Sequence, residues 1–336
     1  MTYEKFKEEL VTELKDIFEE KGLDVEIRNH EYEAPNKTVD GTVMKLKGTD
    51  VAPTLHTDNV YMRWQESDWS VRDIAEQIAD SLEYEYDKIR DLNFEVKDFT
   101  SEFVREHSYL GVVNKETNEE FLSKVPHEDV KGTDLSAYAK INVGDGATIT
   151  ITNEHASYLR MTDSEILNAA RENTMHQDFS VHSMSEVLRD MLPSEIVDEL
   201  EMFPEFEKPN IVMVTNEVGY DGANAILSKD ALNEACEKLG TDDITIIPSS
   251  RHELLAVNAD ALGIESTADI KGMVEEINSL QVPVEDQLSD NIYHYNGSTQ
   301  ELEMCNEQGL FPEHSVEELT LEATQEIDSG MSMGGN

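Results

Sequence analysis

The sequence predicts a mixed α+β fold in which mainly antiparallel sheets carry amphipathic helices. Two patterns favour this class. Apolar residues recur at helical spacing in some segments, and other segments alternate apolar and polar residues between turn-forming residues. The alternating segments predict more antiparallel strand pairs than parallel crossover units.

Residues 1–92 are expected to form a helix, a set of strands and a second helix. Residues 2–21 place apolar side chains on one helical face, and Gly22 is expected to end that helix. A second amphipathic helix is expected at about 70–82. Three alternating segments between the helices are expected to be strands: 24–29, 41–48 and 51–64.

The rest of the chain mixes the same two patterns. A hairpin is expected at 135–153 through a Gly-Asp-Gly turn, then a helix at 162–174 and short helices separated at Pro193. A later hairpin is expected to turn at Asn296-Gly297. The other expected strands are 211–216, 222–227, 242–248 and 252–258, and the other expected helices are 230–240 and 268–280.

These patterns predict four segments along the chain. They are an N-terminal unit at 1–92, a central mixed unit at 93–204, a C-terminal α/β unit at 205–304 and a tail at 305–336. The tail contains no lysine or arginine, because Lys271 is the last basic residue. Acidic terminal segments of this kind are usually disordered, so we expect a flexible acidic tail.

The charge of the chain restricts the classes of partner. The sequence contains 72 Asp and Glu against 26 Lys and Arg, a formal net charge of −46. Phosphate backbones and anionic membranes both bind clusters of cations, so direct nucleic-acid binding and membrane binding are not expected. A basic protein partner is compatible with this charge. The alternative explanation is that the charge serves only solubility.

Cysteine content and terminal composition indicate the compartment. Cys236 and Cys305 form neither a disulfide framework nor a recognisable metal motif, so no metal or cofactor is expected. The N-terminus lacks the apolar core of a signal peptide, and no apolar run is long enough to span a membrane. These features predict a cytoplasmic protein.

Several segments form an ordered series that includes APTLHTDNVY, NKETNEEFLSKVPHED, ATITITNEHASYL, IVMVTNEVGYDGANAILSKDALNEACEKLG and IIPSSRHELLAVN. From residue 1 to about 304 the series resembles an uncharacterised family of Firmicutes proteins, domain of unknown function 5688, with Pro-Ser-Ser-X-His-Glu its most specific block. The C-terminal half is also similar to the YtpQ-type proteins of bacilli. The resemblance implies an intracellular bacterial protein, often encoded near mobile elements, and brings no catalytic residues. Relatives tend to carry a Lys-Asn-Asn-Gly run where this chain has APNKTVDG.

The densest group of reactive side chains lies at 248–253, between two apolar strands. Ser249, Ser250, His252 and Glu253, with the arginine among them, could bind a small ligand or perform acid–base or nucleophilic chemistry. Neighbours on one strand point to opposite faces, so Ser250 and His252 can share a face, but Glu253 cannot easily orient that same imidazole ring. The structural alternative is that the serines satisfy backbone groups at a turn and the histidine is a hydrogen-bonded strand residue.

Two further pairs are candidates for binding. Asn153 and Asn216 stand at strand ends and could line a polar pocket, although asparagines at such places usually cap helices or form turns. Trp64 and Trp69 bracket a polar loop and could anchor an interface. The alternative is that the tryptophans cover the N-terminal core.

Three functions are compatible with these observations. The leading hypothesis is an acidic protein-binding or regulatory protein, one form of which is a nucleic-acid mimic linked to a mobile element. The alternative is a hydrolase or small-ligand-binding protein that uses the turn at 248–253. A structural protein without a specific ligand is the third.

Overall fold

The computed structural model describes residues 1–49, 52–91, 96–144, 147–203, 206, 208–248, 250–264 and 267–305. The chain forms two compact units. The first comprises Met1–Tyr109, Ser123–Pro126 and Ala139–Ala170, and the second comprises Leu110–Leu122, His127–Tyr138 and Arg171–Asn336. Each unit consists of three separate stretches of the chain, whereas the sequence predicts four consecutive segments. The four-segment organisation stays a prediction. The expected acidic tail lies outside the described residues beyond Cys305.

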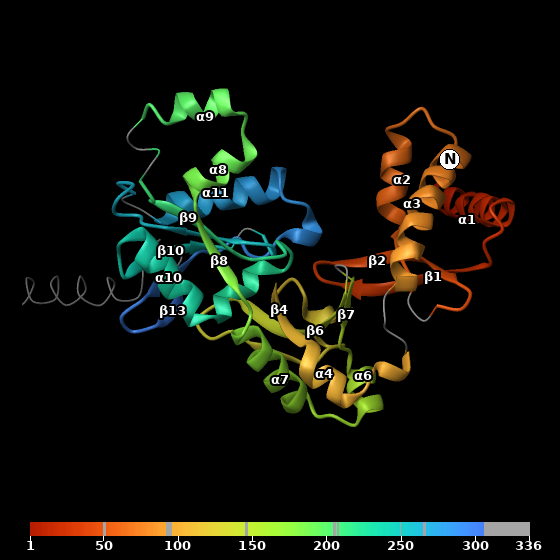
Figure 1. The fold of residues 1–336 in the computed structure, drawn as a ribbon, viewed down its shortest axis with the longest axis horizontal. Coiled ribbons are helices and arrows are strands. Elements are labelled where there is room, and N and C mark those ends of the chain that lie inside the picture. The colour runs from red at the N-terminus through yellow and green to blue at the C-terminus, as the bar shows by residue number, and fades with distance from the viewer. Residues whose placement is uncertain are drawn as a thin grey trace, which may run out of the picture. The chain divides into compact units, whose positions relative to one another are not determined.

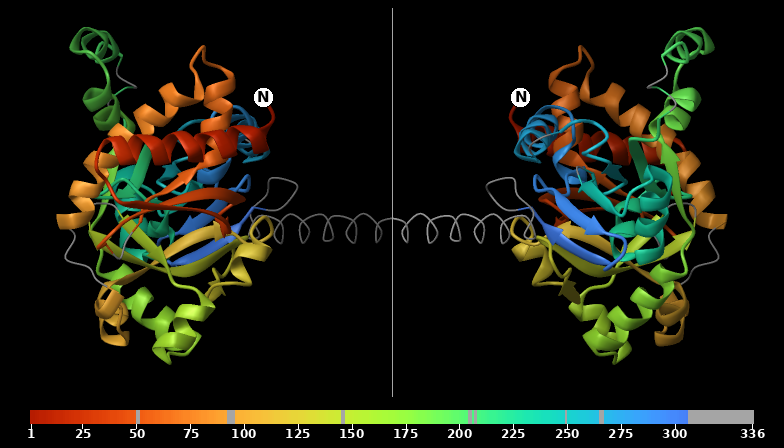
Figure 2. Two further views of the ribbon diagram at one scale, coloured as in Figure 1. Left: turned by 90° about the vertical axis from the view of Figure 1, so that its right-hand side faces the viewer. Right: turned by 90° about the vertical axis from the view of Figure 1, so that its left-hand side faces the viewer.

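The first unit begins with three helices on one face of a small sheet (Figures 1 and 2). Strands β1 (Val25–Ala34), β2 (Lys37–Leu46) and β3 (Thr54–His56) pair antiparallel in that order. The helices are α1 (Tyr3–Glu20), α2 (Thr57–Gln65) and α3 (Val71–Asp91). Phe6, Leu10 and Leu14 of α1 are completely buried, and Ala75 and Ala79 of α3 belong to the same core. These positions confirm the two helices expected at 2–21 and at about 70–82.

The strand expected at 51–64 is wrong beyond its first residues. Thr54–His56 pair with β2, and the chain then turns into α2. In α2, Trp64 lies one helical turn after the buried Val60, and the Trp64 ring packs 5.1 Å from the Phe6 ring. Side chains four residues apart share one face of a helix, so packing against α1 favours the helix at this segment.

A second sheet contains β4, β6 and β5 in that order, with β7 paired to β6. The pairing of β6 with β7 confirms the expected hairpin, and α7 confirms the helix expected at 162–174. Its strands are β4 (Ser108–Asn114), β5 (His127–Asp129), β6 (Leu135–Gly144) and β7 (Ala147–Thr150). The helical segments are η1 (Val96–Asp98), α4 (Ser101–His107), α5 (Glu119–Leu122), α6 (Asn153–Leu159) and α7 (Asp163–Met175).

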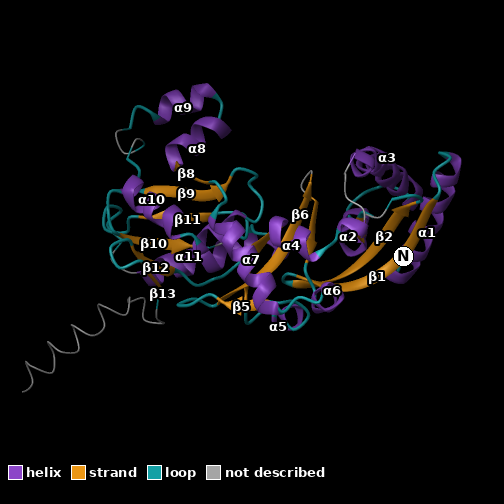
Figure 3. Ribbon diagram, turned by 60° about the horizontal axis from the view of Figure 1, so that its bottom comes forward, coloured by secondary structure: helices purple, strands orange, loops and turns teal. Residues whose placement is uncertain are grey.

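The second unit contains a six-stranded sheet in the order β13-β12-β10-β11-β9-β8 (Figure 3). All five strand pairs are antiparallel, and together with the helices they confirm the α+β class. The strands are β8 (Phe179–Ser183), β9 (Ile211–Asn216), β10 (Asp243–Ile247), β11 (Leu254–Val257), β12 (Tyr293–Asn296) and β13 (Glu301–Met304). The helical segments are α8 (Met184–Met191), α9 (Ser194–Leu200), α10 (Lys229–Leu239), α11 (Thr267–Leu280) and η3 (Val284–Asp286).

The strand expected at 222–227 is wrong. The segment is the 3-10 helix η2 (Gly222–Leu227), in which Ala223, Asn224 and Ala225 are consecutive and completely buried. The Asn224 side chain donates to the Leu110 carbonyl oxygen at 2.9 Å and to the Gln177 side-chain oxygen at 3.0 Å. These contacts come from distant parts of the chain, which local periodicity does not report.

Gly132 provides a test of close packing in the second unit. Its φ is +80°, and a Cβ there would lie 1.9 Å from the Leu302 carbonyl oxygen. We predict that Gly132→Ala lowers the free energy of unfolding by more than about 2 kcal/mol, because steric overlap adds to the strain of positive φ. In Gly263→Ala, φ is +67° but the new Cβ would have no atom within 4 Å outside the neighbouring residues, so the loss of unfolding free energy should be only about 1 kcal/mol. Urea unfolding measures both variants, and equal losses of unfolding free energy would contradict this explanation.

Cys236 provides a test of burial on α10. Its thiol donates to the Asp242 carbonyl oxygen at 3.7 Å, and burial, with the charges of Asp242 and Asp243, raises its pKa to about 11. We predict that iodoacetamide modifies Cys236 slowly at pH 8 in a Cys305→Ala variant, and that the rate keeps rising toward pH 11, since only the thiolate reacts. Mass spectrometry measures the rate. A plateau near the ordinary pKa of 9.0 would contradict the prediction.

Candidate functional site

The turn at 248–253 joins β10 to β11, and a buried ion pair holds it. The Arg251 guanidinium donates from Nε to Asp221 Oδ1 at 3.0 Å, and a second nitrogen lies 2.8 Å from the same oxygen. The side chains of Arg251 and Asp221 are only 12% and 4% exposed. The guanidinium also donates to the Tyr220 hydroxyl at 2.8 Å and lies over the Tyr220 ring.

The imidazole of His252 has partners at both nitrogens. Nδ1 accepts a hydrogen bond from the Asp221 backbone N–H at 3.3 Å, so Nε2 carries the proton that is donated to Asp286 at 3.0 Å. The Ser250 hydroxyl oxygen accepts from the His252 backbone N–H at 3.0 Å. Ser250 therefore serves the turn and does not form the hydroxyl–imidazole pair of a serine nucleophile. Ser249 lies outside the described residues.

The remaining contacts of the turn are also structural. Within the described part of the chain, no hydrogen bond joins Glu253 to the imidazole. A Cβ on Gly222 would lie 2.3 Å from Thr215 Oγ1 and 2.4 Å from the His252 carbonyl oxygen. The backbone at Gly222 therefore lies too close to these two residues for any side chain larger than that of glycine. Burial alone would lower the pKa of Arg251, but the Asp221 charge raises it above its ordinary value, which keeps the ion pair charged.

The two candidate asparagines hold local backbone. The Asn153 amide, in the first unit, donates to the Ser123 carbonyl oxygen at 2.9 Å. The Asn216 side-chain oxygen, in the second unit, accepts from the backbone N–H groups of Val218 and Gly219 at 3.1 and 2.8 Å. Each arrangement is that of an asparagine at the end of an element. A ligand-binding role for them stays a prediction.

The two tryptophans have different surroundings. Trp64 packs on Phe6 at the edge of the core, and its Nε1 donates to the Trp69 carbonyl oxygen at 3.0 Å. Trp69 is 43% exposed. Of the two candidates for an interface, Trp69 is therefore the more accessible, and an interface role for either tryptophan stays a prediction.

Trp69 lies at the rim of a groove between α2 and α3 with a volume of about 510 Å³, which we call the α2–α3 groove. Its apolar side chains are Leu55, Val60, Trp69, Ile74, Ile78 and Leu82. Its polar side chains are Arg63, Glu66, Ser67, Gln77 and Ser81. The sequence indicates the two tryptophans but not the groove, because the groove requires β3, α2 and α3 to be placed together. The signal available in the sequence was a pair of tryptophans beside a helix with an apolar face.

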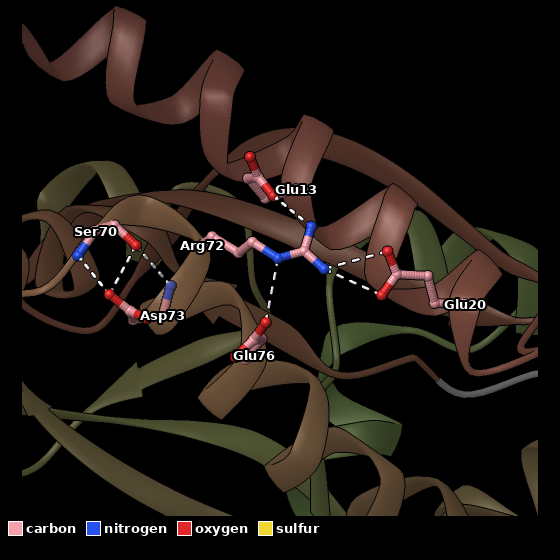
Figure 4. A network of polar contacts seen from close by, with 6 residues as sticks. All are labelled: Glu13, Glu20, Ser70, Arg72, Asp73 and Glu76. Atoms are coloured by element: carbon pink, nitrogen blue, oxygen red, sulfur yellow. Dashed lines mark hydrogen bonds and ion pairs between the residues drawn. The ribbon is translucent and has the colours of Figure 1, made fainter.

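Helices α1 and α3 meet at a cluster of charged side chains, in which carboxylates of both helices surround the Arg72 guanidinium (Figure 4). This α1–α3 seam consists of Glu13, Glu20, Lys21, Arg72, Glu76, Asp80 and Glu83. The single guanidinium contacts three carboxylates at 3.0, 3.1 and 3.2 Å, and the single ammonium contacts two at 2.8 and 2.9 Å. The carboxylates raise the pKa of both cations. Among the side chains that the structure describes, the seam therefore contains five carboxylates and two cations.

The described residues provide neither a metal cluster nor a membrane-spanning helix. No three His, Cys, Asp or Glu residues in the described ranges are grouped so that they could hold a metal ion. No described helix is both long and apolar enough to cross a membrane.

Residues 3–297 match the model of a family described as a family of unknown function, DUF5688. The chain belongs to this family. The matched residues include the α1–α3 seam, the α2–α3 groove and the turn at 248–253, so all three features of this DUF5688 protein lie within the family region. No curated protein and no solved structure matches the chain.

The ion pair at the turn can be tested in this DUF5688 protein by a double-mutant cycle. We predict that Asp221→Ala lowers the free energy of unfolding by about 3 kcal/mol, because it leaves a buried guanidinium without its partner. Arg251→Met should have a similar effect, and the double variant should lose less than the sum of the two. Urea unfolding measures all three. Strict additivity would show that the two side chains do not act as a pair.

Proposed function

We propose that the protein is a cytoplasmic protein-binding or regulatory protein whose partner presents a basic surface. The observation that carries this proposal is the α1–α3 seam, in which one guanidinium serves three carboxylates. The net charge of −46 extends the same imbalance to the whole chain. Such a surface attracts basic partners and speeds their encounter.

The charge also argues against the other classes of macromolecule. A nucleic-acid backbone or an anionic membrane would meet like charge, without the cation clusters that bind phosphate. One form of the proposal is a nucleic-acid mimic that occupies the DNA-binding cleft of a basic protein. Hydrolysis at the turn is less well supported, because both His252 nitrogens are used by Asp221 and Asp286.

Affinity purification of the tagged full chain from the cells that produce it tests the proposal. At low salt we expect a partner with a basic surface, identified by mass spectrometry, and we expect it to be released as salt is raised, because exposed charges are screened. Neutralising three seam carboxylates by Glu20→Gln, Asp80→Asn and Glu83→Gln should weaken its binding about tenfold.

The matched control neutralises three exposed carboxylates of α11 by Asp269→Asn, Glu275→Gln and Glu276→Gln. It makes the same change in net charge and should leave binding nearly unchanged. Release of the partner by duplex DNA would identify the nucleic-acid mimic. Recovery of no basic partner at either salt concentration would overturn the proposed function.

A further inference from the structure

We infer that the free edge of β1 pairs antiparallel with the β1 edge of a second copy of the chain, which joins two three-stranded sheets into one continuous sheet. This inference goes beyond the proposed function and does not rest on it. β1 is the end strand of the order β1-β2-β3, and it pairs with β2 from Val25 to Ala34 without a shift of register. Within the described part of the chain, no backbone hydrogen bond joins β1 to an element other than β2.

The other sheet edges are short or have partners for their backbone groups. β3, β5 and β13 have only three or four residues. On β4, the Leu110 N–H donates to the Thr174 hydroxyl at 2.8 Å, and the Leu110 carbonyl oxygen accepts from the Asn224 amide at 2.9 Å. On β8, the Val181 carbonyl oxygen accepts from Lys238 Nζ at 2.8 Å. β1 is ten residues long and contains neither a proline nor a bulge, so its edge is open to pairing.

Only an extended backbone can satisfy such an edge. Successive residues of an antiparallel strand direct their N–H and C=O groups to alternate sides, so about half of the residues of β1 present these groups at the free edge. The same row on a second copy matches them when the two strands are related by a twofold axis. Asn29, His30 and Glu31, in the middle of β1, are all exposed, so an incoming strand can reach the edge there.

Charge balance favours a second copy over a basic partner at this edge. Residues 25–47, which include β1 and β2, contain four cations and four carboxylates: Arg28, Lys37, Lys45 and Lys47, and Glu26, Glu31, Glu33 and Asp40. The rest of the chain contains 22 cations and 68 carboxylates, since the whole chain contains 26 and 72. Acidic surfaces of two copies repel each other, but this hairpin has no net charge to cause repulsion and none to attract a basic strand.

The carboxylates of β1 itself are largely paired within one copy. Glu26 lies 2.6 Å from Arg28 of the same strand, and Glu33 lies 3.6 Å from Lys124. Two such strands can therefore approach each other without bringing unpaired like charges together along most of their length.

Sedimentation velocity of the full chain, over a range of protein and salt concentrations, tests the inference. We expect a monomer–dimer equilibrium whose Kd falls about tenfold between about 50 and about 500 mM NaCl, because salt screens the repulsion between the acidic chains. Salt should have the opposite effect on the basic partner of the proposed function. A Kd that rises with salt would overturn the inference, since the contact would then depend on attraction between opposite charges.

A charge variant and its matched control test the place of the contact. Arg28 is exposed, and Arg28→Glu changes residues 25–47 to three cations and five carboxylates, so the dimer Kd should rise about tenfold. Arg63→Glu makes the same change at an exposed position of α2 and should leave the Kd nearly unchanged. Equal effects of the two variants would overturn the assignment to β1.

Proline tests the backbone pairing directly. Of His30→Pro and Glu31→Pro, one removes an N–H bonded to β2 and the other removes an N–H at the free edge, because neighbouring residues alternate. The variant whose urea midpoint stays closer to that of the unchanged chain is the edge variant, and it should be monomeric. A folded edge variant that still forms dimers, or a chain that is monomeric at every protein and salt concentration, would overturn the inference. The proposed function fails separately, by the absence of a basic partner.

Discussion

Repulsion among the 72 carboxylates of this chain is the constraint on which its structure depends. Several of the few cations lie where two elements meet, and each pairs with at least one carboxylate of the neighbouring element. Arg72 joins α1 to α3 along the seam. Lys7 of α1 pairs with Asp40 of β2, and Lys238 of α10 contacts Glu186 of α8 at 2.7 Å. These cations hold the elements of each unit together.

Neutral donors replace cations around a buried carboxylate in the second unit. Asp134 accepts hydrogen bonds from the amides of Asn114 and Asn291 at 2.7 and 3.0 Å, and from the Ser289 hydroxyl at 2.8 Å. It also accepts from the Tyr293 hydroxyl at 2.5 Å. Burial and the Asp134 charge raise the pKa of Tyr293 well above its ordinary value, so the hydroxyl stays protonated and continues to donate. Four neutral donors thus satisfy this buried carboxylate.

The turn at 248–253 and the first unit differ in how far their charged side chains are paired. The turn at 248–253 contains reactive residue types, but its guanidinium and its imidazole have partners within the protein, and its contacts connect it to Thr215 of β9, to Asp221 and to Asp286. The first unit differs, because its seam has surplus carboxylates and its groove leaves Trp69 exposed. Unsatisfied charge and exposed apolar surface are the features that a partner can use, and both occur in this unit.

The sequence by itself determined the charge, the α+β class and the elements with clear periodicity, such as Tyr3–Glu20 and Lys229–Leu239. It also pointed to Trp64 and Trp69 as candidates for an interface. Only the tertiary structure decided that residues 57–65 and 222–227 are helical. It also decided that Asp221 and Asp286 form hydrogen bonds with the two nitrogens of the His252 ring, and that β3, α2 and α3 together form a groove. The reason is physical. Periodicity reports which face of a segment is apolar, whereas these features depend on contacts between residues far apart in the chain.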